Sequence, residues 1–171
     1  MTLSGGEPLV QASFATALLE RCRGAGIHTV VETCGHGARE ALLGMEPLVD
    51  RFYFDLKLAD EAEHERATGV SNQVIVGNLR ALAERARERI VVRVPVVPGV
   101  TDAEANANGI AALVEEAGVG EVELRPYHGM GAHKYEELGR AYGLGELPAF
   151  LGEEALRRFA EPFVARGMRC W

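Results

Sequence analysis

Short runs of β-branched residues alternate with amphipathic helical patterns along most of the chain, and this alternation limits the possible folds more than any other feature. The clearest run covers residues 90–97, where only Arg93 and Pro95 interrupt the apolar residues. Such a run is typical of a strand buried on both faces of a parallel sheet. Because helical patterns follow these runs, we expect repeated β–α units, which build either an open parallel sheet or a barrel.

Periodicity and helix breakers predict the boundaries of the individual elements. The expected strands cover residues 27–32, 52–57, 90–97, 122–124 and 169–171. The expected helices cover residues 10–24, 36–45, 60–67 and 74–88, the last with Val76, Leu79, Ala83 and Ala86 on one face. A further helix, capped by Thr101 or Asp102, should bury Ile110 and Val114. After a loop-rich stretch to about residue 150 we expect a final helix, bent or broken near Pro162.

Charge and hydropathy narrow the class of protein. The 171 residues contain 25 Asp and Glu against 18 Lys and Arg, a formal net charge of −7. This acidic balance argues against general nucleic-acid binding, because duplex binders usually carry a basic face. No apolar run approaches the roughly 18 residues of a membrane span. We therefore expect a single soluble domain over residues 1–171, located in the cytoplasm, with no nucleic-acid or membrane partner.

The cysteines Cys22, Cys34 and Cys170 lie far apart in the sequence. Neither a disulfide framework nor a self-contained zinc or iron–sulfur site is expected, because such sites usually place at least two ligands within a few residues. Cys22 is in helical phase with Phe14 and Leu18, which predicts that its thiol is buried in helix packing.

Five groups of polar residues share one placement, because each lies in or just after an expected strand. They are Gly5-Gly6-Glu7, Glu32-Thr33-Cys34-Gly35, Asp55-Leu56-Lys57, Arg93 and Tyr127-His128. In β–α folds the carboxyl ends of the strands form the functional face, where side chains from several strands converge. Their common position is stronger evidence for a site than any single group.

Each group also has a purely structural explanation. Gly5 and Gly6 could form a simple turn, and Asp55 and Lys57 could pair with each other. His128 could cap a loop or contact a ligand. Arg93 is harder to explain in this way, because burying an unpaired guanidinium costs several kcal/mol. It therefore requires an anion, either from the protein or from a ligand.

The segment Thr2-Leu3-Ser4-Gly5-Gly6-Glu7-Pro8 resembles the second-strand motif of radical S-adenosylmethionine (SAM) enzymes, specifically the activating enzymes of glycyl-radical enzymes typified by pyruvate formate-lyase activating enzyme. Later motifs follow in that family's order: Glu-Thr-Cys-Gly (32–35), Asp-Leu-Lys (55–57), Gly-Val-Ser-Asn (69–72), Arg93 before Val-Val-Pro-Gly (96–99), and Pro-Tyr-His (126–128) followed by Gly131, Lys134 and Tyr135. The resemblance covers nearly the whole chain. It implies an α/β fold, a partial (β/α) barrel of the radical SAM type that lacks the first strand, first helix and cluster loop.

The resemblance also implies roles for the polar groups. Gly5 and Gly6 would let the backbone approach the SAM amino group, since glycine has no Cβ to obstruct it, and Glu7 would support their loop. The residues Asp55 and Lys57 would hold the ribose and carboxylate region of SAM.

In the same way, the resemblance implies that Arg93 holds the SAM carboxylate and His128 the adenosine side. A zwitterionic methionine group needs both acceptors and a cation, which these assignments provide.

Glu32, Thr33 and Asp55 match residues that help to bind a monovalent cation near the sulfonium in relatives. The family commonly has Asp-Thr-Asn-Gly where this chain has Glu32-Thr33-Cys34-Gly35, so the longer Glu32 changes the shape of that cation site. We interpret Cys34 as part of the pocket wall and not as a cluster ligand.

Enzymes of this family carry a Cys-x-x-x-Cys-x-x-Cys loop that binds a 4Fe-4S cluster, at which SAM is cleaved to a 5′-deoxyadenosyl radical. No such motif occurs in these 171 residues. The resemblance therefore implies the C-terminal part of an activase that installs a glycyl radical on a pyruvate formate-lyase-like enzyme, with flavodoxin or ferredoxin as electron donor. We expect the chain by itself to be inactive.

The first residue suggests why the cluster motif is missing. Relatives commonly have valine where this chain has Met1, and the valine codon GTG is also a bacterial start codon. We expect that an internal codon was taken as the start and that the chain is part of a longer protein. Missing strands would expose a sheet edge, which predicts an edge-to-edge homodimer of the fragment.

Two alternative functions compete with an activase. The first is a non-catalytic module, derived from the activase, that binds SAM or the partner enzyme. The second is an unrelated barrel enzyme in which Asp55 and Lys57 act as acid and base at a strand end. That alternative leaves the ordered motifs unexplained.

Overall fold

The computed structural model describes residues 1–129, 137–139, 141 and 151–171. Its strands are β1 (Thr2–Leu3), β2 (Val30–Thr33), β3 (Arg51–Asp55), β4 (Ile90–Val96), β5 (Glu121–Pro126) and β6 (Arg169–Cys170). Its helices are α1 (Ala12–Gly24), α2 (Arg39–Met45), α3 (Glu61–Thr68), α4 (Gln73–Ala86), α5 (Glu104–Ala117) and α7 (Glu153–Ala165). Short 3₁₀ turns, η1 (Pro8–Gln11), η2 (Glu46–Leu48) and η3 (Arg87–Arg89), precede α1, β3 and β4.

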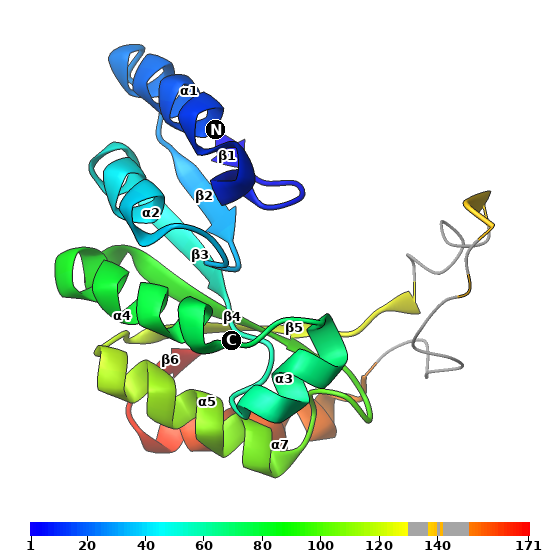
Figure 1. Cartoon of the computed structure of the whole chain (residues 1–171). Helices are drawn as coiled ribbons and strands as arrows, with labels where there is room; N and C mark the ends of the chain where they lie inside the picture. Colours follow the sequence, from blue (N-terminus) through cyan, green and yellow to red (C-terminus); the bar gives the residue numbers. More distant parts are fainter. Residues whose placement is uncertain (130–136, 140, 142–150) are drawn as a thin grey trace.

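All six strands form one parallel sheet in the order β1-β2-β3-β4-β5-β6. The strands turn progressively from β1 to β6, and α1, α2, α4, α5 and α7 line one side of the resulting curved sheet (Figure 1). Within the described residues β1 and β6 remain the two edges and do not pair with each other. The sheet is therefore open, and the expected α/β fold with a partial barrel is confirmed.

The two faces of the sheet differ in chemistry, because side chains alternate between faces along each strand. In β3, Phe52 and Phe54 are fully buried, whereas Tyr53 and Asp55 are partly exposed. The helix-covered face carries Val31, Thr33, Phe52, Phe54, Val92, Val94, Val96, Val122 and Leu124. The opposite face, called the inner face below, carries the partly exposed residues Val30, Glu32, Arg51, Tyr53, Asp55, Arg93, Pro95, Glu121 and Glu123. Among the described residues, the inner face of the sheet is therefore the less covered of the two.

The predicted helix boundaries are close to those observed, but two details differ. In α4, Val76 of the predicted apolar face is partly exposed, and Ile75 is buried in its place. The predicted cap of α5 is wrong, because the helix begins after Ala103 and has no side-chain cap. Thr101 instead accepts a hydrogen bond from the Val97 amide at 2.8 Å, so it stabilises the turn after β4.

The final helix is also more regular than predicted. Of the expected bend or break near Pro162, the break is wrong, because residues Glu153–Ala165 form one helix with Pro162 inside it. Phe159 and Phe163, both buried, hold this helix against the core on either side of the proline. The proline ring leaves the Arg158 carbonyl without its helical donor, but Arg158 lies on the exposed side, where water can satisfy that group.

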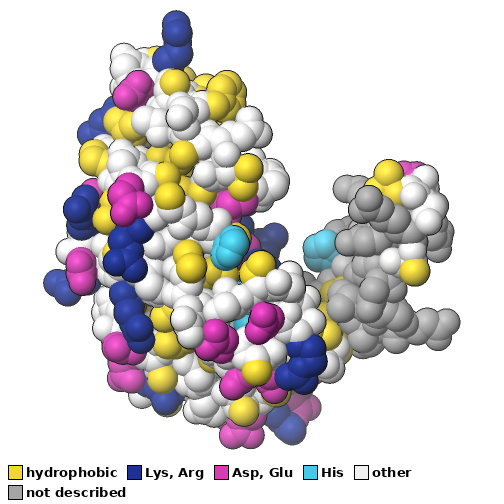
Figure 2. Space-filling model, in the orientation of Figure 1, with side chains coloured by type: hydrophobic (Ala, Val, Ile, Leu, Met, Phe, Trp, Pro, Cys, Tyr) yellow, Lys and Arg dark blue, Asp and Glu magenta, His cyan; other side chains and the backbone are white. Residues whose placement is uncertain are grey.

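The surface carries both acidic and basic side chains, as the composition of the chain indicates (Figure 2). On the face seen in Figure 2, basic and acidic side chains are interspersed and do not form one continuous basic field. In the described part of the chain no helix is long and apolar enough to cross a bilayer.

Candidate SAM site

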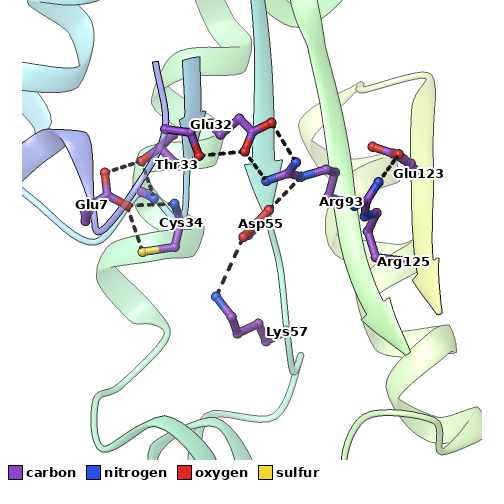
Figure 3. Close-up of polar contacts among 11 residues, drawn as sticks. Glu7, Glu32, Thr33, Cys34, Asp55, Lys57, Arg93, Glu123 and Arg125 are labelled. Carbon is purple, nitrogen blue, oxygen red and sulfur yellow. Dashed lines mark hydrogen bonds and ion pairs between the residues drawn. The ribbon is translucent and has the colours of Figure 1, made fainter. Parts of the chain in front are cut away.

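Four strands bring the predicted polar residues together on the inner face and at its carboxyl edge (Figure 3). β1 ends at Leu3, directly before Ser4, and β2 ends at Thr33. β3 ends at Asp55, which pairs with Arg93 in the middle of β4. Parallel pairing of consecutive strands therefore places residues that are far apart in the sequence within one site.

Glu7 connects the loop after β1 to the end of β2. One carboxylate oxygen accepts hydrogen bonds from the Leu9 amide at 3.0 Å and the Thr33 hydroxyl at 2.6 Å. The other accepts from the Cys34 amide at 2.8 Å and the Cys34 thiol at 3.0 Å. Burial, followed by the hydrogen bond to Glu7, raises the pKa of the Cys34 thiol. The Cys34 thiol thus stays neutral and donates to Glu7.

The loop that Glu7 supports contains two glycines with left-handed backbone. Gly5 has φ +87° and Gly6 φ +45°, conformations that other residues rarely adopt. A Cβ atom at either position would meet no other atom within 4 Å. The glycines are therefore required by the turn itself, and the backbone beside them is open to a ligand.

Arg93 is held by two carboxylates. Its Nε donates to Asp55 Oδ1 at 2.9 Å, while Nη1 and Nη2 lie 3.1 and 3.3 Å from the two oxygens of Glu32. Glu32 also accepts a hydrogen bond from the Ser4 hydroxyl at 2.8 Å. The predicted anionic partner of the mid-strand arginine is therefore supplied by the protein, and the same contacts join β4 to the glycine loop.

These contacts change the acid–base behaviour of the site. Burial by itself would lower the pKa of Arg93, but the charge and hydrogen bond of Asp55 and those of Glu32 outweigh it, so the pKa is raised. For Glu32, burial by itself would raise the pKa, but hydrogen bonds from Ser4 and Arg93 lower it. Both groups are therefore charged at neutral pH.

Lys57 completes the charge balance of the site. Its Nζ lies 3.9 Å from Asp55 Oδ2, so the possible pairing of these two residues is present but long. Three carboxylates, those of Glu7, Glu32 and Asp55, face two cations, Arg93 and Lys57, an excess of one negative charge. A ligand with a net positive charge, such as SAM with its ammonium and sulfonium groups, complements this balance.

The predicted His128 lies at the other edge of the site. It follows β5 and is exposed. Gly131, Lys134 and Tyr135, which extend the same motif, lie outside the described residues.

Several residues of the site were not predicted from the sequence. Ser4 belongs to the recognised motif, but its bond to Glu32 depends on the register of β1 and β2. The Arg93 guanidinium carbon lies 5.3 Å from the centre of the Tyr53 ring. Alternation along β3 places Tyr53 on the same face as Asp55, which is the signal that could have identified it.

Buried asparagines hold the loops that follow the strands. The Asn78 amide donates to the Gly35 and Gly37 carbonyls at 2.8 and 2.9 Å. The Asn106 amide donates to the Lys57 and Thr101 carbonyls at 3.1 and 2.8 Å, which connects the loops after β3 and β4. These helix residues act on the site through backbone positions that no local sequence pattern identifies.

The cysteines are distributed over three separate elements. Cys22 is buried in α1, as predicted, Cys34 follows β2, and Cys170 lies in β6, where burial raises the pKa of its thiol to about 11. Among the residues that the structure describes, no three His, Cys, Asp or Glu side chains are arranged to hold a metal ion. Within the described part of the chain, the three cysteines therefore do not meet at one metal site.

Two named relatives match nearly the whole length of this chain. The isethionate sulfite-lyase activating enzyme of Nitratidesulfovibrio vulgaris is 46% identical over 167 residues, which are 97% of this chain and 53% of that protein. The indoleacetate decarboxylase activating enzyme of Tractidigestivibacter scatoligenes is 36% identical over 99% of this chain and 54% of its own length. The chain thus spans about half the length of the curated relatives it matches.

Solved structures show the same fold. A domain of the pyruvate-formate lyase-activating enzyme from Bacteroides vulgatus superimposes with a TM-score of 0.79 over 100% of this chain and 96% of that chain, at 24% sequence identity. A radical SAM methyltransferase from Sphaerobacter thermophilus superimposes with a TM-score of 0.65, at 18% identity over 99% of this chain and 49% of that one. The family model of the Radical SAM superfamily matches residues 1–107, which include the glycine loop, Glu32, Asp55 and Arg93. An unrelated barrel enzyme is thereby excluded, and the chain belongs to the radical SAM superfamily.

Proposed function

We propose that residues 1–171 form a single radical SAM core fragment that binds SAM within an activating enzyme for a glycyl-radical enzyme. Bound SAM supplies the 5′-deoxyadenosyl group with which such activases remove a hydrogen atom from a glycine of the partner. The observation that carries the proposal is the Ser4–Glu32–Arg93–Asp55 connection, which places an open glycine loop and a fixed guanidinium in one site.

Each group of the site has a part in SAM binding. The backbone at Gly5 and Gly6 receives the ammonium group, because no side chain covers it. Arg93 receives the carboxylate, while Asp55 and Lys57 hold the ribose and carboxylate region. Glu32 and Asp55 line the surroundings of the sulfonium, where the excess negative charge stabilises the cationic centre. Thr33 is buried on the opposite face and takes part only through its hydrogen bond to Glu7. His128 contacts the adenosine side.

The partner in this proposal is a glycyl-radical enzyme of the pyruvate formate-lyase type, and the electron donor is flavodoxin or ferredoxin. The named relatives activate a sulfite-lyase and a decarboxylase, which supports this class of partner. The reducing chemistry supports a cytoplasmic location. A SAM-binding module without radical chemistry is the alternative, and it is supported by the cysteine positions described above.

The 171-residue chain is expected to gain no site-bound cluster when it is reconstituted with iron and sulfide. The reason is that its cysteines lie in α1, after β2 and in β6 and cannot ligate one cluster together. Mössbauer spectroscopy after desalting tests this, with the Cys34→Ser variant as control. A stoichiometric 4Fe-4S signal that disappears in the variant would contradict the prediction.

We also propose that the isolated chain forms an edge-to-edge dimer. β1 is an open edge of the sheet, and Val10 and Phe14, in the following η1 and α1, are 78% and 66% exposed. Light scattering should give twice the 18.5 kDa mass of the chain. Phe14→Glu should yield monomers, whereas Val74→Glu, at an exposed position of α4, should not. A wild-type monomer at high concentration would disprove the dimer.

A further inference from the structure

Tyr53 lies on the inner face between the two partners of the Glu32–Arg93 ion pair. In the sheet, Tyr53 pairs with Glu32 of β2 and precedes Asp55 by two residues, so the three side chains share one face. Arg93 pairs with Asp55 and is therefore the diagonal neighbour of Tyr53, a separation that an aromatic and a long side chain can bridge. The Arg93 guanidinium carbon lies 5.3 Å from the ring centre.

The carboxylates and the ring restrain different motions of Arg93. Glu32 and Asp55 contact Nε, Nη1 and Nη2, and so hold the edges of the guanidinium. These contacts leave one N–H on each terminal nitrogen for another acceptor. Edge contacts alone permit the plane to rock about the line joining the two carboxylates. An aromatic ring against one face of the plane removes that freedom, because cations are attracted to the ring face.

We propose that Tyr53 is a positioning residue of the SAM site: its ring supports one face of the Arg93 guanidinium, so that the remaining N–H groups point to the carboxylate of the ligand. The inference rests on the proposed function, because it specifies how that site recognises the carboxylate. Arg93 keeps this orientation before the ligand arrives, which reduces the entropy lost on binding.

A simple space-filling role for Tyr53 makes a different prediction. If the ring only covered the sheet, its removal would weaken binding of every ligand alike or destabilise the fold without selectivity. If Tyr53 instead positions Arg93, removal of its ring weakens the binding only of ligands that carry the carboxylate. The useful comparison is therefore between SAM and decarboxylated SAM, which retains the sulfonium, the amine and the adenosine but lacks that group.

The experiment measures the dissociation constants of both compounds by isothermal titration calorimetry with the 171-residue chain. Tyr53→Leu should weaken SAM binding about fivefold and leave decarboxylated SAM within about twofold. Tyr53→Phe, which keeps the ring and removes the hydroxyl, should restore the affinity for SAM. Trp171→Leu is the matched control, because Arg169 lies over the Trp171 ring at 4.8 Å in a similar contact that does not involve Arg93. This control should leave both affinities unchanged.

A second measurement needs no ligand. Urea unfolding of Tyr53→Leu, Arg93→Met and the double variant forms a double-mutant cycle, and the two effects should be less than additive because the residues share one contact. Additive effects would overturn the positioning role.

The binding measurements distinguish a failure of the Tyr53 proposal from a failure of the proposed function. If the wild-type chain binds SAM but Tyr53→Leu weakens both ligands equally or neither, the role of Tyr53 is disproved and the proposed function stands. If the wild-type chain binds neither compound, the proposed function is overturned and the role of Tyr53 with it.

Discussion

Replacement of Arg93 by alanine is expected to weaken SAM binding by about 30-fold or more, because truncating one partner of a hydrogen-bonded charge pair typically costs about 2–5 kcal/mol. The ligand carboxylate would lose its cation, and Glu32 and Asp55 would lose the group that holds them together. Without the guanidinium between them, these two carboxylates would repel both each other and the ligand carboxylate. Calorimetric titration measures the loss, and circular dichroism verifies that the variant is folded.

Two further variants test whether the loss of SAM affinity depends on the guanidinium group of Arg93 itself. Arg93→Lys keeps the charge but cannot contact Glu32 and Asp55 with a planar fork, so an intermediate affinity is expected. Arg125→Ala removes an exposed arginine of β5 that pairs with Glu123 at 3.0 Å, and should change the affinity by about twofold at most. Equal affinities of wild type and a folded Arg93→Ala variant would exclude Arg93 from the SAM site.

Gly35→Ala is expected to produce the largest loss of stability, about 3 kcal/mol, since it combines a left-handed backbone with overpacking of the core. Gly35 has φ +70°, and a Cβ atom there would lie 2.2 Å from Cζ of Phe54. The Phe54 ring is fully buried and cannot move away freely. Urea unfolding followed by circular dichroism measures the change in the free energy of unfolding.

Gly44→Ala provides the control for this substitution. Gly44 lies in α2, and a Cβ atom there would meet no other atom within 4 Å. Alanine favours helix over glycine by up to about 1 kcal/mol, so this variant should be as stable as the wild type or slightly more stable. A Gly35→Ala variant with wild-type stability would contradict the described packing between the loop after β2 and the core.

Much of the architecture could be predicted from the sequence because its signals are local. The β-branched run that became β4 and the apolar periodicity of α4 and α5 depend on neighbouring residues, and they predicted these elements closely. The helix does not break at Pro162, because contacts with residues distant in the sequence decide its course. Burial of Phe159 and Phe163 against the core is a tertiary effect that overrides the local tendency of proline to end a helix.

The sequence singles out Glu32, Asp55 and Arg93 as polar residues in or just after expected strands, but it does not show which of them contact each other. A mid-strand Arg93 signals an anionic partner, yet the choice of Glu32 and Asp55 depends on the register of three strands. The same register gives Tyr53 its place beside Arg93. No local sequence pattern identifies Asn106, because its amide donates hydrogen bonds to the Lys57 and Thr101 carbonyls of two different loops.

The central claim is that this fold binds SAM between the glycine loop and Arg93. A titration of the ¹⁵N-labelled chain with SAM, followed by NMR, tests it most directly. The expected result is a saturable shift of the amide signals of Gly5, Gly6, Glu32, Asp55 and Arg93, with the α5 and α7 signals unchanged. No saturable shift, or shifts confined to residues outside the inner face and its carboxyl edge, would contradict the claim.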